Sequence, residues 1–190
     1  NGKVKLFFLD RNRVEVKFLN KIKEVKKLND IQLAICLVKK NPLETIFQKA
    51  TELGVSKIIP LISDRTEVKD INYERAKKIV IEATEQSNQL IPPTISDITK
   101  LKNFLESLDQ STKLLFADVN SKNNLDIKDF KKAKSLCVLI GPEGDFTPKE
   151  RETILSRTNT IPFSLSNNIL RADTATISAI SLINFVLSDH

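Results

Sequence analysis

From Ile31 onward, short runs of apolar residues alternate with segments whose apolar residues recur at helical spacing. The runs have the length of buried strands and lie at 31–38, 57–61, 113–117 and 136–140. This alternation is typical of a parallel sheet that is covered by helices on both faces. We therefore predict an α/β domain with a parallel sheet over residues 31–190.

Local signals mark where the helices begin and end. Asn41-Pro42-Leu43-Glu44 predicts a helix start with Asn41 as the N-cap, and Gly54 ends that helix. Thr147-Pro148-Lys149-Glu150 combines an N-cap, a proline at the first helical position and a capping box. The segment from Asp173 to Leu187 is apolar on nearly every face, so we expect it to be buried within the subunit or against a partner.

The first thirty residues carry most of the net charge of +6, with nine Lys or Arg residues against four Asp or Glu residues. Residues 3–9 and 13–19 have strand patterns, and the charged segment 21–30 is the expected domain boundary. Two strands alone are marginally stable, so we expect earlier strands of a small β module to precede residue 1. The excess charge favours a polyanion partner, and a solvated basic hairpin is the alternative.

Several familiar kinds of site have no counterpart in the sequence. The single histidine, His190, is the last residue, which argues against histidine-based catalysis and the usual zinc sites. Cys36 and Cys137 lie in apolar runs, so we expect buried thiols in a reducing, cytoplasmic environment. No GxGxxG or GxxxxGK(S/T) motif is present. The apolar pattern predicts a soluble protein without a signal peptide or a membrane span.

Two polar stretches flank a helix-length segment in the last third of the chain. They are LIGPEGDFTPKE at 139–150 and SLSNNILRADTA at 164–175. Each begins where a strand ends, as does the loop after Phe116-Ala117, and the carboxyl ends of parallel strands share one edge of the sheet. Loops rich in backbone donors and poor in nucleophiles suit an adenine-containing cofactor that itself brings the chemistry. Arg171 precedes the apolar helix, and we expect it not to be a solvated surface charge.

Three further groups of polar residues lie at the ends of helices and strands. They are Lys49, Thr51 and Glu52; Asp64, Arg65 and Thr66; and Glu82, Glu85, Gln86 and Ser87. A solvated helix end is the ordinary explanation for each group. Alternatively, Arg65 pairs with a phosphate and Gln86 reads a base edge through two hydrogen bonds.

Five stretches, taken in order and at their separations, resemble the motifs of one family. They are QKATELGV (48–55), SDRT (63–66), EATEQS (82–87), IGPEGDF (140–146) and SLSNNILRADTA (164–175). The pattern resembles that of the RsmE-type ribosomal RNA uridine-N3 methyltransferases, within the SPOUT superfamily. The match runs from about Ile31 to the C-terminal helix.

The resemblance implies a fold, an activity and a set of partners. The implied fold is a parallel sheet with a deep trefoil knot in its C-terminal part, in a homodimer. Residues 1–28 would be the end of a PUA-like RNA-binding β module, and residues 31–190 the SPOUT methyltransferase domain. The implied activity is S-adenosylmethionine-dependent methylation of the N3 atom of a uridine in the 16S rRNA of the small ribosomal subunit.

The resemblance also implies roles for individual residues. Arg171 would stabilise negative charge on the uracil, and Glu143 would be an orienting group or a weak candidate for a general base. The implied cofactor-binding residues are Phe116, Ala117, Ile140, Gly141, Pro142, Gly144, Leu165, Ser166, Asn168, Ile169 and Leu170. The implied substrate-binding residues are Lys49, Glu52, Arg65, Gln86, Arg11 and Arg13.

The chain departs from the family pattern at several positions. Asp145 and Ser166 replace glycines, and both still permit cofactor binding through main chain atoms. Asn168 replaces an arginine and Gln89 replaces a basic residue, so RNA contacts are less expected at these two positions. Asp173 replaces a glutamate.

Three other functions stay open at this point. The chain could be a SPOUT methyltransferase that acts on another RNA position, such as a ribose 2′-hydroxyl. It could be a non-catalytic RNA-binding assembly factor, or a nucleotide-binding α/β domain of another kind. The product nucleoside, the binding of S-adenosylmethionine and the preference for ribosomal RNA over ATP discriminate among these functions.

Overall fold

The computed structural model describes residues 2–10, 13–21, 30–126, 128, 130 and 133–188 of the chain. Within these residues the strands form two sheets, one with two antiparallel strands and one with seven strands. In the larger sheet the order is β5-β4-β3-β8-β7-β9, with β6 also paired to β4, and every pairing is parallel. The predicted parallel α/β domain is therefore confirmed.

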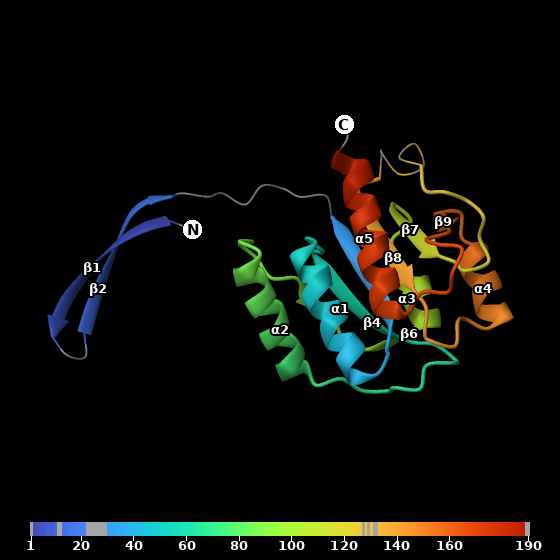
Figure 1. Ribbon diagram of the computed structural model, residues 1–190, viewed down its shortest axis with the longest axis horizontal. Helices are drawn as coiled ribbons and strands as arrows, with labels where there is room; N and C mark the ends of the chain where they lie inside the picture. The colour runs from blue at the N-terminus through green and yellow to red at the C-terminus, as the bar shows by residue number, and fades with distance from the viewer. Residues whose placement is uncertain are drawn as a thin grey trace.

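The elements follow one another along the chain as a hairpin and then as alternating strands and helices (Figure 1). The strands are β1 (Gly2–Asp10), β2 (Arg13–Lys21), β3 (Ile31–Cys36), β4 (Lys57–Ile62), β5 (Thr94–Ile95), β6 (Thr99–Lys100), β7 (Thr112–Ala117), β8 (Ser135–Ile140) and β9 (Thr160–Phe163). The helices are α1 (Lys40–Glu52), α2 (Tyr73–Gln86), α3 (Leu101–Ser107), α4 (Pro148–Leu155) and α5 (Ala172–Ser188).

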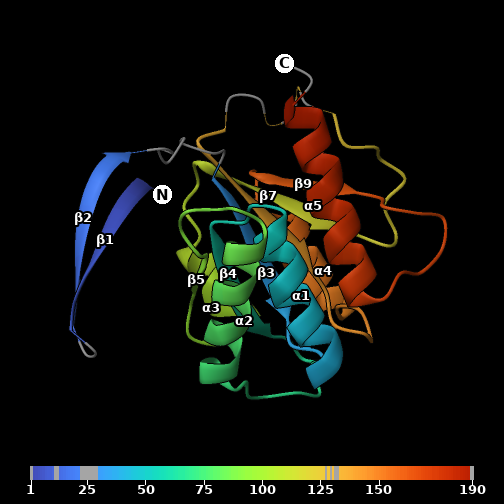
Figure 2. The same cartoon turned by 60° about the vertical axis from the view of Figure 1, so that its left-hand side comes forward.

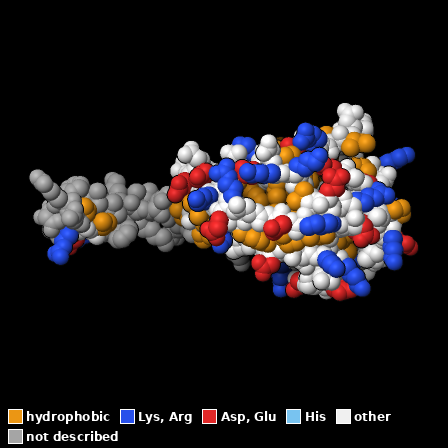
Figure 3. Space-filling model, turned by 90° about the horizontal axis from the view of Figure 1, so that it is seen from below, with side chains coloured by type: hydrophobic (Ala, Val, Ile, Leu, Met, Phe, Trp, Pro, Cys, Tyr) orange, Lys and Arg blue, Asp and Glu red, His pale blue; other side chains and the backbone are white. Residues whose placement is uncertain are grey.

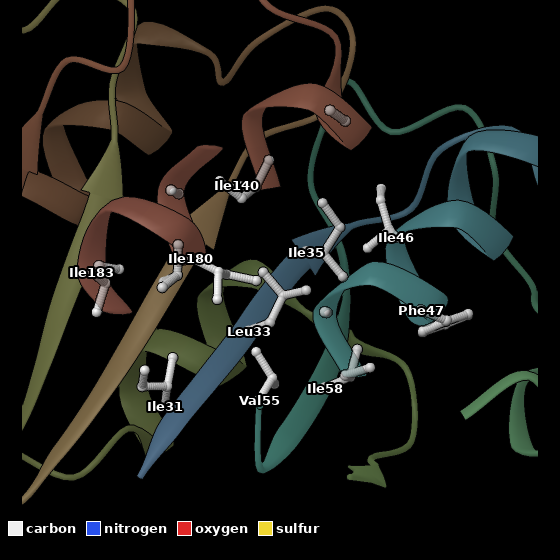
Figure 4. Close-up of a cluster of buried hydrophobic side chains, with 14 of the residues drawn as sticks. Ile31, Leu33, Ile35, Ile46, Phe47, Val55, Ile58, Ile140, Ile180 and Ile183 are labelled. Atoms are coloured by element: carbon white, nitrogen blue, oxygen red, sulfur yellow. The ribbon is translucent and has the colours of Figure 1, made fainter. Parts of the chain in front are cut away.

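Helices cover both faces of the parallel sheet, and alternate residues of each strand separate two cores (Figure 2). Ile31, Leu33 and Ile35 of β3 face α1 and α5, as the close-up of this core shows (Figure 4). Ala34 and Cys36 of the same strand belong to the opposite core, beneath α3 and α4. A strand that is buried on both faces has a continuous run of apolar residues, and for this reason β3 is recognisable in the sequence.

The helix starts agree with the predicted signals in one case and differ in another. Thr147 caps α4: its hydroxyl accepts from the main chain N–H of Glu150 at 3.2 Å, and the Glu150 carboxylate accepts from the Thr147 N–H at 2.9 Å. The prediction that Asn41 caps α1 is wrong, because α1 begins at Lys40 and its N-cap residue, Lys39, makes no side-chain cap. Pro42 is then the third helical residue. An N–H at this position has no partner within the helix, so proline loses no hydrogen bond there.

Helix α5 is buried along one face only. Ala172, Thr176, Ala179, Ile180 and Ile183 are buried in it, whereas Phe185 exposes 65% of its surface. Within this chain α5 is thus covered along one face, and the burial of its other face against a partner stays a prediction. In the described part of the chain, no helix combines the length and apolar character required to cross a bilayer.

The strand order brings three separate loops to the same place. β8 lies between β3 and β7, and β9 lies on the far side of β7. Because the pairings are parallel, the ends Ala117, Ile140 and Phe163 meet at one edge, the lower edge of the sheet in Figure 1. Any site formed by the following loops is thus assembled around strand ends that lie up to 46 positions apart in the sequence, from Ala117 to Phe163.

Candidate functional site

A cleft of about 640 Å³ opens at this edge, between the loops that follow β7, β8 and β9 and the start of α5. Its lining consists of Ala117, Asp118, Val119, Ile140, Gly141, Pro142, Glu143, Gly144, Asp145, Ser164, Leu165, Ser166, Asn168, Ile169, Leu170, Arg171, Ala172 and Ala175. Ten of the eleven predicted cofactor-binding residues lie in this lining, as do both predicted catalytic residues. Apolar side chains, exposed main chain and a few charged groups therefore converge in one concave site.

Phe116, the eleventh predicted residue, lies behind the cleft instead of lining it. Its side chain is buried and packs against Phe146 with the ring edge toward the face, at a centroid distance of 5.6 Å and an interplanar angle of 66°. Phe146 in turn covers Gly141, where an added Cβ atom would lie 3.0 Å from a ring carbon. Phe116 thus supports the glycine loop from behind, and Gly141 leaves room for the Phe146 ring.

The loop after β8 turns at Pro142–Asp145 and is held by Arg65. The Asp145 N–H donates to the Pro142 carbonyl at 3.0 Å, and Arg65 Nη1 donates to the Gly144 carbonyl at 2.9 Å. Asp145 has a φ of 56°, in the left-handed region that glycine adopts most easily and that Asp tolerates. A glycine, which the resemblance implies at this position, would adopt this conformation readily, and Asp145 adopts it in this chain.

An ion pair at the edge of the cleft was not predicted. Asp118, whose side chain is 1% exposed, accepts from Arg151 of α4 at 2.7 Å and 3.2 Å, and also accepts from the Asn120 N–H at 3.0 Å. The Asp118 hydrogen bond raises the pKa of Arg151 above its usual value. The pair fixes the loop after β7 to α4. No spacing rule links a loop aspartate to a helical arginine 33 residues later, so the sequence carries no signal for it.

Glu150 makes a second long-range connection. Besides closing the capping box, its carboxylate accepts from the Asp64 N–H at 2.8 Å. The loop after β4 is thereby joined to the first turn of α4, close to the point where Arg65 meets Gly144. The SDRT loop, distant in the sequence, is thus held against α4 and against the IGPEGDF loop, next to the cleft.

The loop after β9 carries the residues most accessible to a ligand. The Ser164 N–H donates to the Asn123 carbonyl at 2.9 Å, and the Asn168 N–H donates to the Ser166 hydroxyl at 3.0 Å. Ile169 is 88% exposed, and the Arg171 side chain is 71% exposed, with Nε 3.8 Å from a carboxylate oxygen of Asp173. The expectation that Arg171 is not solvated is wrong for this single chain, because α5 begins at the rim of the cleft and not within the core.

The predicted substrate-binding residues do not line the cleft. Lys49 and Glu52 form an ion pair at 2.9 Å in the last turn of α1, and Gln86 lines a separate cavity between α1 and α2. The Gln89 amide holds the end of α1 by donating to the carbonyls of Thr51 and Glu52. Arg65 is adjacent to the cleft through Gly144. Arg13 is exposed on β2, and Arg11 lies outside the described residues.

The cysteines take no part in the site. Cys36 and Cys137 are free and buried, as predicted, and desolvation raises the pKa of each thiol to about 12. Among the described residues, no group of three or more His, Cys, Asp or Glu side chains is placed to hold a metal ion. Among the described residues, the cleft can therefore bind, orient and place charge next to a ligand, and it has no cysteine thiol to act as a nucleophile.

Comparisons with known proteins agree with this arrangement. A family model described as "RNA methyltransferase domain" matches residues 24–184. Ribosomal RNA small subunit methyltransferase E of Rickettsia conorii is 35% identical over 96% of this chain and 75% of its own length.

Two solved structures have the same fold at the level of the whole chain. The protein of the same name from Neisseria gonorrhoeae, bound to S-adenosylmethionine, superposes with a TM-score of 0.85 at 25% identity, over 97% of this chain and 78% of that one. A methyltransferase of Legionella pneumophila, in complex with the same cofactor, has a TM-score of 0.76 at 28% identity, over 96% of this chain and 77% of that one. The chain belongs to the RNA methyltransferase domain family, among the ribosomal RNA small subunit methyltransferase E proteins.

Proposed function

We propose that the protein transfers a methyl group from S-adenosylmethionine to the N3 atom of a uridine in the 16S rRNA of the small ribosomal subunit. The observation that carries the proposal is the cleft: ten residues selected as cofactor-binding from the sequence converge in one concavity at the carboxyl edge of the sheet. The proteins of Neisseria and Legionella with the same fold bind S-adenosylmethionine.

The residues of the cleft fit this cofactor. A volume of about 640 Å³ lies in the range of small-molecule sites. Gly141 and Gly144 expose main chain donors and acceptors, while Ile140, Leu165 and Leu170 offer apolar surface for an adenine ring. Glu143 and Asp145 place negative charge at the lining, which suits a cationic sulfonium. When bound, S-adenosylmethionine supplies the electrophilic methyl group.

Arg171 is the residue we assign to the substrate. Its guanidinium is exposed at the cleft and only loosely held by Asp173, so it is free to meet an incoming base. Methylation at N3 removes the imide proton of uracil, and the negative charge that develops on the flanking carbonyl oxygens is stabilised by two donors of a guanidinium. Glu143 orients the base or accepts its proton. Placement and electrostatics supply most of the acceleration, because the N3 atom of the substrate is itself the nucleophile that attacks the methyl group.

The remaining features of the family belong to the same proposal. Phe185 near the end of α5 and Ile169 in the loop before α5 are exposed apolar side chains that a second copy would cover in a homodimer. The loops after β8 and β9 would form a deep trefoil knot, and the hairpin β1–β2 would end a PUA-like module that uses Arg13 on RNA. Such an enzyme meets its substrate in the cytoplasm.

The identity of the methylated atom tests the proposal. The protein is incubated with labelled S-adenosylmethionine and 16S rRNA or small subunits that lack the modification, and the RNA is digested to nucleosides. We expect the label in N3-methyluridine. Label in a 2′-O-methyl nucleoside would instead make the protein a methyltransferase of another RNA position, and absence of both cofactor binding and label would make it an RNA-binding assembly factor.

Two variants test the roles of the residues. Gly141→Val fills the glycine loop and is expected to abolish both cofactor binding and methylation. Arg171→Ala is expected to preserve cofactor binding and to lower kcat by about 100-fold or more, the usual cost of losing one charge-stabilising donor. An unchanged methylation rate in Arg171→Ala would show that the assigned role for Arg171 is wrong.

A further inference from the structure

A second cleft, larger than the first, is lined by Ser63 and Asp64 of the SDRT loop. It has a volume of about 750 Å³ and lies between α3, α4 and the end of β4. Five cationic side chains line it, against three carboxylates: Lys69, Lys100, Lys102, Lys149 and Arg157 against Asp64, Glu106 and Glu150. Buried Leu101 and Leu105, with half-buried Ile62, form an apolar floor.

Most of the carboxylates in this cleft are already engaged. Glu150 accepts from Asp64 N–H and from both donors of Thr147, and Glu106 pairs with Lys102 at 3.9 Å. Arg157 is also engaged, because its guanidinium donates to the carbonyls of Leu105 and Leu108 at the end of α3.

Three lysines of the cleft form no ion pair with a described residue. Within the described part of the chain, Lys69, Lys100 and Lys149 have no ion-pair partner, and all three are exposed. Among the described residues, Asp64 is the one carboxylate of the lining whose side chain likewise has no hydrogen-bond or ion-pair partner. The cleft therefore presents a net surplus of uncompensated positive charge.

The SDRT loop connects the two clefts. Asp64 and Glu150 line the second cleft, and the adjacent Arg65 holds Gly144 of the first at 2.9 Å. Both open toward the carboxyl ends of the strands, and Figure 3, which views the molecule from that side, shows Lys and Arg side chains spread over the surface with acidic and hydrophobic ones between them. A strand of RNA whose target base enters the first cleft would pass over the SDRT loop to reach the second cleft.

We propose that the second cleft binds the phosphodiester backbone of single-stranded RNA next to the target nucleotide, through Lys69, Lys100 and Lys149. The choice of RNA as the ligand rests on the proposed function. Lysine ammonium groups on flexible stems neutralise phosphates without reading sequence, so the cleft positions the RNA while the first cleft selects the base. An RNA strand is favoured over an acidic protein because the neighbouring cleft is assigned to a nucleotide of the same strand.

The salt dependence of RNA binding tests the inference. The probe is an oligouridylate of about 12 nucleotides, within the roughly 4–16 nucleotides of common single-strand sites. Each single-strand phosphate contact contributes about 0.7 to the slope of log affinity against log salt, so the triple variant K69A/K100A/K149A should lower the slope by about 2. The affinity of the variant should then be about 100-fold lower than that of the wild type at roughly 0.1 M salt, and the two should converge near 1 M.

The matched control removes three lysines that do not line the cleft, K77A/K78A/K134A, all exposed. S-adenosylmethionine binding, measured by calorimetry on every variant, should equal that of the wild type, which separates this inference from the proposed function. Equal slopes for the cleft variant and the control would overturn the inference, even if the wild type methylates RNA. It would also be overturned if the cleft variant lost binding to polyglutamate but kept its affinity for the oligouridylate.

Discussion

Gly141 and Gly144 belong to the same motif, yet the structure predicts opposite results when each is replaced by alanine. A Cβ atom at position 141 would lie 3.0 Å from a ring carbon of Phe146, whereas carbon contacts are comfortable at about 3.5–4.0 Å. Phe146 is buried and packs on Phe116, so the ring cannot retreat freely. Overpacking of this kind costs about 1–3 kcal/mol, and loss of glycine's freedom in the unfolded chain offsets about 0.4–1 kcal/mol.

Gly141→Ala should therefore lower the free energy of unfolding by about 1–2 kcal/mol in urea denaturation. Because Gly141 lines the first cleft, the variant should also weaken S-adenosylmethionine binding by about tenfold or more, which corresponds to about 1.4 kcal/mol. At position 144 a Cβ would make ordinary contacts at 3.7 Å with Arg65, and φ is not positive there. Gly144→Ala should thus be neutral or stabilising by about 0.4–1 kcal/mol. Equal losses in both variants, or an unchanged Gly141→Ala, would refute the packing argument.

Four further measurements probe the site and the core beside it. Asp118→Asn removes the charge paired with Arg151, and we expect the free energy of unfolding in urea to fall by about 1–3 kcal/mol. The control Asp64→Asn changes an exposed carboxylate and should leave that free energy within about 0.5 kcal/mol of the wild type. Asp145→Gly should be about 1 kcal/mol more stable than Asp145→Ala, because φ at this position is 56°. Cys36 and Cys137 should resist alkylation at pH 8 in the native state, since a pKa of about 12 lowers the thiolate population about 1000-fold relative to an ordinary thiol. Their raised pKa also predicts that stability falls as the pH rises from about 9 toward 12, because the unfolded chain loses these protons first.

Much of the fold follows from local patterns. Continuous apolar runs identify β3, β7 and β8 because these strands are buried on both faces, and the capping box at Thr147 and Glu150 is satisfied within four residues. The cleft follows from one topological rule: loops after parallel strands share an edge, so the ends at Ala117 and Ile140 predict a common site.

Features that depend on distant partners could not be predicted in the same way. The Asp118–Arg151 pair and the Glu150–Asp64 connection join segments 33 and 86 residues apart, and no periodicity relates them. The start of α1 differs from the prediction because a cap is a weak preference that the first turn can do without. The exposure of Arg171 depends on where α5 meets the cleft, which the apolar composition of the helix does not determine.

The transfer of the methyl group itself tests the central claim most directly. Small ribosomal subunits are prepared from cells that lack this activity and from cells that possess it, and each is incubated with the protein and tritiated S-adenosylmethionine. The account predicts incorporation that approaches one methyl group per subunit in the first preparation and close to none in the second, with the label retained in the RNA. No incorporation into the first preparation, or equal incorporation into both, would contradict it.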